Sequence, residues 1–88
     1  MRDPKKTGQF KKDYKLVGKR RKDMSKLDVV MRILISGNDL PPKYKEHKLG
    51  GNWKDFYECH IEPDWLLIYD YDDTFVSFER TGTHSDLF

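Results

Sequence analysis

The C-terminal half of the chain carries side chains that could act together on a phosphodiester. His60, Asp64 and Arg80 fall at the ends of predicted strands, and His84 follows Arg80 across a glycine-containing turn. RNA is cleaved through its own 2′-hydroxyl when a base removes the hydroxyl proton, a cation holds the phosphate and an acid protonates the leaving 5′-oxygen. Histidine suits both proton roles because its ordinary pKa lies near neutrality. Arginine suits the phosphate because its planar fork matches two oxygens.

Two more residues could reach the same place. His47 lies in a loop that leads into the first of the strands, and Phe88 ends the chain with no apparent apolar support. Each candidate also has an ordinary interpretation when taken alone: a strand-end histidine is usually solvated, and an aspartate often caps a turn. The case for a site depends on the convergence of all three histidines with one carboxylate and one guanidinium.

Zinc is the main chemical alternative for this group. His47, His60, Asp64 and His84 are acceptable ligands. The sequence has no HxxxH or HExxH spacing, its single cysteine excludes a CxxC site, and Arg80 would repel a dication. We therefore expect a reaction without a metal or other cofactor.

Two helices and a sheet must position these residues. Phe10, Tyr14 and Val17 recur at helical spacing. A second helix is predicted from the apolar residues at 27, 30, 31 and 34, with Asp23 or Ser25 as its cap and Gly37-Asn38 as its end. Residues 39–51 form a predicted loop. Strands are predicted at 53–60, 64–71 and 74–80, and the short joints between them imply an antiparallel meander. Residues 1–6 are a weak candidate for another strand because of Pro4 and their charges.

The predicted class is therefore α+β, a single domain spanning residues 1–88 with two N-terminal helices on a small antiparallel sheet. If the first hairpin is centred on Glu62 and the second on Asp72, then His60 lies opposite Asp64 and Asp64 lies opposite Arg80. Opposed residues share a face, so these three would form one row at the rim of the sheet. The strand at 65–69 is apolar on both faces and needs a second cover, either an irregular segment of this chain or a partner.

Charge is distributed unevenly along the chain. Residues 1–48 hold 15 Lys and Arg against 6 Asp and Glu (a balance of +9), and residues 49–88 hold 2 against 9 (a balance of −7). The cluster Lys19, Arg20, Arg21 and Lys22 could dock on a polyanion such as RNA, or it could be a solvated helical face. One cysteine, no signal peptide and no long apolar run fit a cytoplasmic protein without membrane attachment.

With the residue blocks HIEPDWLLIY and FERTGTHSDLF in its C-terminal half, the chain resembles YafQ-type toxins of the RelE/ParE superfamily. The resemblance rests on HIEPDWLLIY at 60–69 and FERTGTHSDLF at 78–88. It extends to YKEHKL at 44–49, GNWK at 51–54 and KRRKDM at 19–24, and it covers residues 8–88. The charged N-terminus departs from the family pattern, in which the first strand contains apolar residues.

The resemblance implies a RelE-like fold, with a small curved antiparallel sheet, and a toxin of a type II toxin–antitoxin system. It implies metal-independent cleavage of mRNA on the ribosome, in the decoding site of the 30S subunit, and a DinJ-type antitoxin as partner. The family's active-site positions fall on His47, His60, Asp64, Arg80, His84 and Phe88. We expect His84 to be the general acid and either His60 or Asp64 to be the base. Arg80 would hold the phosphate, His47 would support charge, and Phe88 would stack on a base of the RNA.

Two other classes of protein remain as alternatives. ParE-like relatives share the fold and act on DNA gyrase without cleaving RNA, but they are not expected to carry this set of side chains. A basic nucleic-acid-binding module without catalysis is the other possibility. Mapping mRNA ends after incubation with translating ribosomes separates the three.

Overall fold

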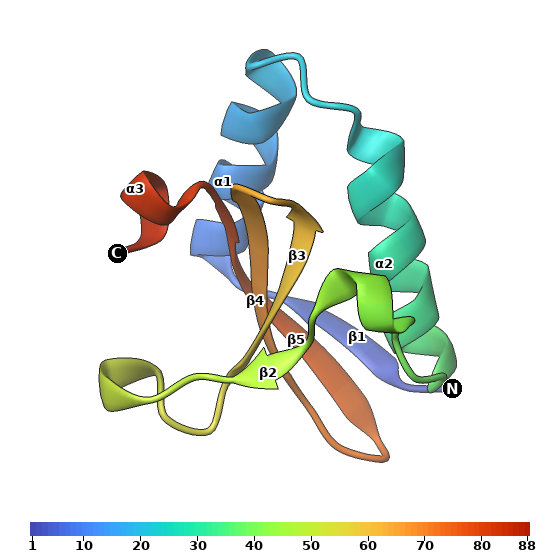
Figure 1. Ribbon diagram of the computed structural model, residues 1–88. Helices are drawn as coiled ribbons and strands as arrows, with labels where there is room; N and C mark the ends of the chain where they lie inside the picture. The colour runs from blue at the N-terminus through green and yellow to red at the C-terminus, as the bar shows by residue number, and fades with distance from the viewer.

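A computed structural model describes the whole chain, residues 1–88, and it confirms the α+β class (Figure 1). The elements are β1 (Asp3–Lys6), α1 (Gly8–Lys19), α2 (Met24–Ser36), β2 (His47–Lys48), β3 (Tyr57–Glu62), β4 (Trp65–Tyr71), β5 (Phe75–Gly82) and α3 (His84–Leu87), with single 3-10 turns at Pro42–Tyr44 and Gly51–Trp53. The sheet order is β1-β5-β4-β3-β2. Every neighbouring pair is antiparallel except β1 and β5, which are parallel.

The two long helices begin and end where local chemistry places them. Thr7 caps α1 by accepting a hydrogen bond from the backbone N–H of Phe10. Asp23 caps α2 in the same way through Ser25, and Gly37, at φ 87°, ends it in the left-handed conformation that favours glycine. Both boundaries of α2 were therefore predictable from the sequence.

The main core lies between these helices and one face of the sheet. Phe10 and Val17 of α1 and Leu27, Val30 and Leu34 of α2 are almost fully buried. They pack with strand residues that include Trp65, Leu67, Tyr69, Val76 and Phe78. Figure 1 shows α1 and α2 diverging from their connecting turn along one side of the twisted sheet. None of the helices has the length and apolar character that crossing a bilayer requires.

The opposite face of β4 is covered by the chain itself. Leu66 and Ile68 are fully buried there, against Leu87 of α3 and the partly buried Leu49, Trp53 and Phe56. The second face of the apolar strand β4 is therefore covered by an irregular segment of this chain, together with α3, and not by a partner. The same finding corrects the first predicted strand, which begins at Tyr57 and not at residue 53, because the preceding residues form this cover.

Two further elements differ from the predictions. β1 is a strand despite Pro4, because it lies at the edge of the sheet, where a missing backbone N–H is tolerated. The turn predicted after Arg80 is absent, because β5 continues to Gly82 and the short helix α3 begins at His84. Its Thr83 and Asp86 side chains form a reciprocal capping box.

The predicted register of the hairpins is wrong. His60 pairs with Leu66, and Asp64 lies in the turn between β3 and β4 instead of opposite His60. Arg80 pairs with Ile68. The main cause is the position of the two turns. Glu62 pairs with Trp65 and Tyr71 pairs with Val76, so both turns lie later in the chain than the assumed centres at Glu62 and Asp72. A β-bulge in each hairpin, one between His60 and Glu62 and one where β4 passes from Ile68 to Tyr69, changes the pairing by one residue. Each extra residue shifts the pairing that symmetrical hairpins would have.

Candidate active site

Four aromatic rings form a file along one end of the sheet. The ring centroids of His47 and His60 lie 6.2 Å apart, those of His60 and His84 lie 6.2 Å apart, and those of His84 and Phe88 lie 6.4 Å apart. The rings come from β2, β3, the first residue of α3 and the end of the chain. The predicted convergence of the three histidines is confirmed, and Phe88 joins them with 61% of its surface exposed.

His84 is held by Asp64. The Nδ1 atom of His84 lies 2.7 Å from Oδ1 of Asp64, and the backbone N–H of His84 donates to the same oxygen at 3.0 Å. These two hydrogen bonds, the backbone one first, lower the pKa of Asp64 below its ordinary value. Asp64 therefore stays ionised near neutrality, fixes the orientation of the His84 ring and leaves Nε2 of His84 facing outward.

Contacts of Asp86 with Gly82 and with Arg20 hold the helix α3, which begins at His84, in place. Gly82 precedes it at φ 156°, and a Cβ atom there would lie 2.8 Å from a carboxylate oxygen of Asp86, so this close approach requires glycine. Arg20, in the turn after α1, pairs with both oxygens of Asp86 at 2.5 and 3.1 Å. The Arg20 guanidinium and the Thr83 backbone N–H hold the pKa of Asp86 far below its ordinary range.

A buried carboxylate, Glu58, lies between the other two histidines. Its Oε1 atom is 3.2 Å from Nε2 of His47 and 3.9 Å from Nε2 of His60, and the residue is only 4% exposed. Our sequence analysis missed Glu58. A usable signal was present, because residues two apart on a strand share a face and Glu58 precedes His60 by two.

Backbone carbonyls determine how these two histidines carry their protons. Nδ1 of His60 lies 3.2 Å from the carbonyl oxygen of Pro63, and Nδ1 of His47 lies 2.9 Å from that of Lys45. A carbonyl only accepts, so each Nδ1 donates. Neutral His60 then has a free lone pair on Nε2. His47 directs its Nε2 at the Glu58 carboxylate, so it satisfies both contacts only as an imidazolium ion.

Arg80 does not join the predicted row with His60 and Asp64. It lies at the end of a different row of paired residues that crosses four strands: His47, Glu58, Ile68 and Arg80. No hydrogen bond or ion pair connects Arg80 to a histidine. Its Nε and Nη2 atoms contact Asp13 of α1 at 2.7 and 3.3 Å, which leaves Nη1 uncommitted on a side chain that is 24% exposed.

Asp13 is a second buried carboxylate beside the site that was not predicted from the sequence. It is 6% exposed and also accepts from the backbone N–H of Thr81 at 3.2 Å. β1 pairs with β5 only as far as Phe78, so the Asp13 carboxylate satisfies the strand edge beyond that point. The signal was an acidic residue three positions after Phe10 and four before Val17, on the apolar side of α1.

The basic cluster between the helices divides into two pairs. Arg20 is bound to Asp86, and Lys22 lies 3.2 Å from Glu62, which Lys26 also contacts at 2.9 Å. These lysines, Lys26 first, lower the pKa of Glu62. Lys19 and Arg21 are exposed and have no carboxylate partner. Lys19 and Arg21 can therefore meet an external polyanion without breaking an internal contact, whereas Arg20 and Lys22 cannot.

The site could also accommodate a metal ion. One ligand atom from each of His47, Glu58 and His60 lies within 4.8 Å of the others. This trio differs from the set considered from the sequence, because His84 and Asp64 bind each other. Arg80 lies two strands from Glu58 and pairs with Asp13, so its charge is a weaker argument against a cation than the sequence suggested.

The geometry can perform acid–base chemistry on a phosphodiester. His60 presents a lone pair on Nε2, and His84, when doubly protonated beside the Asp64 carboxylate, presents an Nε2 proton. The centroids of the two rings lie 6.2 Å apart. His47 adds positive charge in its protonated form, and Arg80 offers a free N–H at the other end of the same row of paired residues. The exposed ring of Phe88 offers a stacking surface beside His84.

Comparison with known proteins gives the family and supports the fold. The family model for YafQ, a bacterial toxin of type II toxin–antitoxin systems, matches residues 2–88. The mRNA interferase toxin YafQ of Escherichia coli K12 is 51% identical over 88 residues, which cover 99% of this chain and 96% of that protein. The structure of the E. coli DinJ–YafQ complex superposes with a TM-score of 0.93 at 50% identity, covering 100% of this chain and 99% of the other. A metal-bound toxin from Helicobacter pylori gives a TM-score of 0.91 at 39% identity, with both chains fully covered. The chain belongs to the YafQ family of bacterial type II toxins.

Proposed function

We propose that this protein is an mRNA interferase, an endoribonuclease that inhibits translation by cutting mRNA on the ribosome. The observation that carries the proposal is the approach of the His60 and His84 rings, whose centroids lie 6.2 Å apart and whose Nδ1 atoms are held by different acceptors, a carbonyl oxygen and a carboxylate. His60 is held by the Pro63 carbonyl with a free lone pair on Nε2. His84 is held by the Asp64 carboxylate with Nε2 turned outward.

In this mechanism His60 is the general base and His84 the general acid. His60 removes the 2′-hydroxyl proton, the oxygen attacks the adjacent phosphorus, and the bond to the 5′-oxygen breaks. His84 acts as the acid in its doubly protonated form: Nδ1–H stays hydrogen-bonded to the Asp64 carboxylate, and the Nε2 proton passes to the leaving oxygen. Asp64 is a poor base because its pKa is lowered, so it positions His84 instead. The products are a 2′,3′-cyclic phosphate and a 5′-hydroxyl.

Three other residues serve the charged transition state. His47 and the free Nη1 of Arg80 supply positive charge to the phosphate, and the buried Glu58 balances the charge of the two histidines beside it. Phe88 stacks on a base of the substrate and sets its position. None of these roles requires a metal or an organic cofactor.

The partners follow from the same surfaces. The mRNA enters the file of rings, and exposed cations such as Lys19 and Arg21 dock the protein on the decoding region of the 30S subunit. A DinJ-type antitoxin inhibits the toxin by folding on contact. Since the chain itself covers both faces of β4, we expect the antitoxin to bury other exposed apolar surface and to approach the rim, where Phe88 leaves an apolar ring exposed. Such a protein acts in the cytoplasm, where its ribosomes are.

The proposal is tested by adding the protein to translating ribosomes and mapping mRNA 5′ ends, with the same mRNA free of ribosomes as the comparison. Discrete cuts within codons on ribosome-bound mRNA are expected. Intact mRNA in both samples would contradict the proposal, and inhibition of DNA gyrase by the same preparation would favour a ParE-like activity instead.

The antitoxin arm is tested by hydrogen exchange of the toxin with and without a DinJ-type antitoxin. Protection is expected on the helices or on residues 65–88, including the amides of α3. A partner that protected none of these regions would contradict this mode of inhibition.

A further inference from the structure

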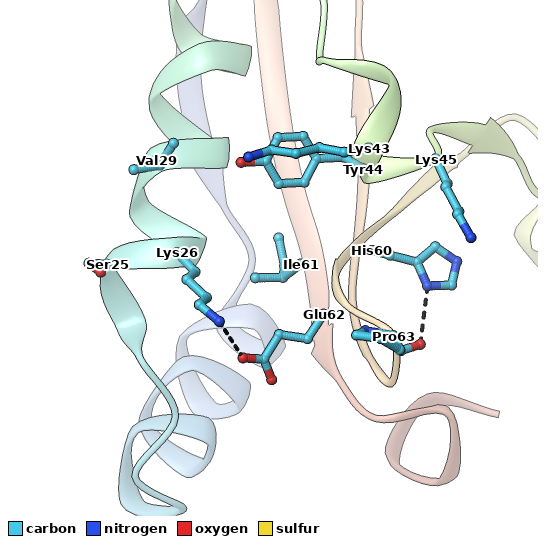
Figure 2. Close-up of a pocket in the computed structure, with 10 residues that line it drawn as sticks. All are labelled: Ser25, Lys26, Val29, Lys43, Tyr44, Lys45, His60, Ile61, Glu62 and Pro63. Carbon is cyan, nitrogen blue, oxygen red and sulfur yellow. Dashed lines mark hydrogen bonds and ion pairs between the residues drawn. The ribbon is translucent and has the colours of Figure 1, made fainter.

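A cleft of about 610 Å³ opens beside the file of rings (Figure 2). One wall is the start of α2, with Ser25, Lys26 and Val29. The other wall comprises residues 43–45, in and just after the 3-10 turn Pro42–Tyr44, and residues 60–63, at the end of β3 and the start of the turn that follows it. His60 belongs both to this cleft and to the catalytic file. The cleft is therefore continuous with the position where the scissile phosphate would lie.

The cleft carries an excess of positive charge. Lys26, Lys43 and Lys45 line it, and Glu62 is the one carboxylate among its lining residues. Glu62 already receives two lysines, Lys26 at 2.9 Å and Lys22 at 3.2 Å. Lys43 and Lys45 have no carboxylate partner, and Lys43 rests over the ring of Tyr44, 5.1 Å from its centroid. Two exposed ammonium groups without a carboxylate partner thus stand at the mouth of the cleft, beside the partly buried ring of Tyr44, which packs against the main core.

The loop that carries these lysines is built into the catalytic site. Lys45 adopts a left-handed backbone conformation at φ 52°, which costs a non-glycine residue free energy. In this conformation its carbonyl accepts from Nδ1 of His47, while its side chain lines the cleft. The hydroxyl of the buried Tyr69 donates to Glu46 and ties the loop to the core. Lys45 therefore links the catalytic site to the cleft, because its backbone orients His47 and its side chain lines the cleft.

We propose that this cleft is a binding subsite for the mRNA strand on one side of the scissile phosphate. Lys43 and Lys45 contact backbone phosphates of the flanking nucleotides, and the ring of Tyr44 provides an apolar wall for a base. The inference rests on the proposed function and extends it, since it names a second stretch of substrate that the protein holds. The positive excess and the continuity with His60 favour RNA over an acidic peptide, which could be attracted by the charge but would have no reason to continue into the file of rings.

The test uses photocrosslinking of an RNA that the protein cannot cut. The probe is a single-stranded oligonucleotide with 2′-O-methyl groups throughout and 4-thiouridine at the flanking positions, presented free and within a ribosome-bound mRNA. We expect crosslinked peptides from residues 43–45 and 25–29. The double variant K43Q/K45Q should lower the yield five- to tenfold and reduce the slope of log affinity against log salt by about 1.4, since each single-strand phosphate contact contributes about 0.7.

The matched control is K11Q/K15Q, which removes the same charge from the exposed face of α1. Equal loss in both double variants, crosslinks outside the cleft, or no crosslinking of the unaltered protein would each overturn the subsite. The subsite would also be overturned if oligoglutamate binding depended on Lys43 and Lys45 and RNA binding did not. Failure of the subsite and failure of the proposed function give different results. If the K43Q/K45Q variant cuts mRNA at the normal rate, the subsite is wrong. If the unaltered protein crosslinks in the cleft but never cuts mRNA, the proposed activity is wrong.

Discussion

The Nδ1 atom of His84 lies 2.7 Å from Oδ1 of Asp64, although 20 residues separate the two in the chain. The contact joins the turn between β3 and β4 to the first residue of α3. It turns an exposed, nearly terminal histidine into a ring of defined orientation, since the same carboxylate oxygen also accepts the backbone N–H of His84. The catalytic proposal depends on this pair more than on any other contact.

The first prediction concerns that pair. His84→Ala should lower mRNA cleavage by at least about a hundredfold, because the leaving oxygen loses its proton donor. Asp64→Asn should have a smaller effect, about tenfold, because an amide oxygen can still accept from the ring but carries no charge. Ser85→Ala, at the exposed neighbouring position, is the matched control and should cut normally. If His84→Ala folds and cuts at the normal rate, the histidine has no part in the chemistry.

The second prediction concerns the fastening of α3. Asp86→Asn should lower the free energy of unfolding by about 1 kcal/mol at pH 7, because it weakens a helix cap and a bidentate arginine pair together. The pKa of Asp86 is lowered in the folded state, first by Arg20, so its contribution is complete above the unfolded pKa of about 3.9. It is lost as the pH falls toward the folded value.

Denaturant titrations at several pH values check this prediction. The difference between the original protein and Asp86→Asn should be constant above about pH 5 and should shrink as the pH falls below about 4. Arg20→Gln should behave in the same way. A difference that grew on acidification would mean that the ion pair does not stabilise the helix.

The third prediction divides the basic cluster. Replacing Lys19 and Arg21 with Gln should weaken ribosome binding and flatten its salt dependence, with no change in the unfolding midpoint, because neither residue has an internal partner. Replacing Arg20 and Lys22 should lower stability, because both are engaged with Asp86 and Glu62. Ribosome binding that ignores the first pair would identify the cluster as a solvated face.

The fourth prediction concerns metal ions. Cleavage should survive treatment of the protein with EDTA, provided the ribosomes keep their own magnesium. Added zinc should inhibit, because an ion held by His47, Glu58 and His60 would occupy the lone pair that the base needs. An activity that EDTA abolishes and zinc alone restores would contradict the mechanism.

Much of this arrangement could be predicted from the sequence, and the failures have definite causes. Helix caps and apolar periodicity are local, so α1 and α2 were found where they lie. Pairing register depends on the exact position of each turn and on bulges, and neither is fixed by composition, which is why Arg80 was placed opposite Asp64 instead of Ile68. Glu58 and Asp13 were missed because charged residues on strands and helices are usually exposed, and only tertiary packing buries these two.

The most direct measurement of the central claim is the chemistry of the cut ends. The protein is incubated with ribosomes that translate one of two mRNA templates. The nucleotide at the cleavage site carries a ribose in one template and a 2′-deoxyribose in the other. If His60 and His84 drive attack by the 2′-hydroxyl, the ribose template yields a 2′,3′-cyclic phosphate upstream and a 5′-hydroxyl downstream, and the deoxy template stays intact. Cleavage of the deoxy template, or fragments that carry a 5′-phosphate, would contradict the mechanism.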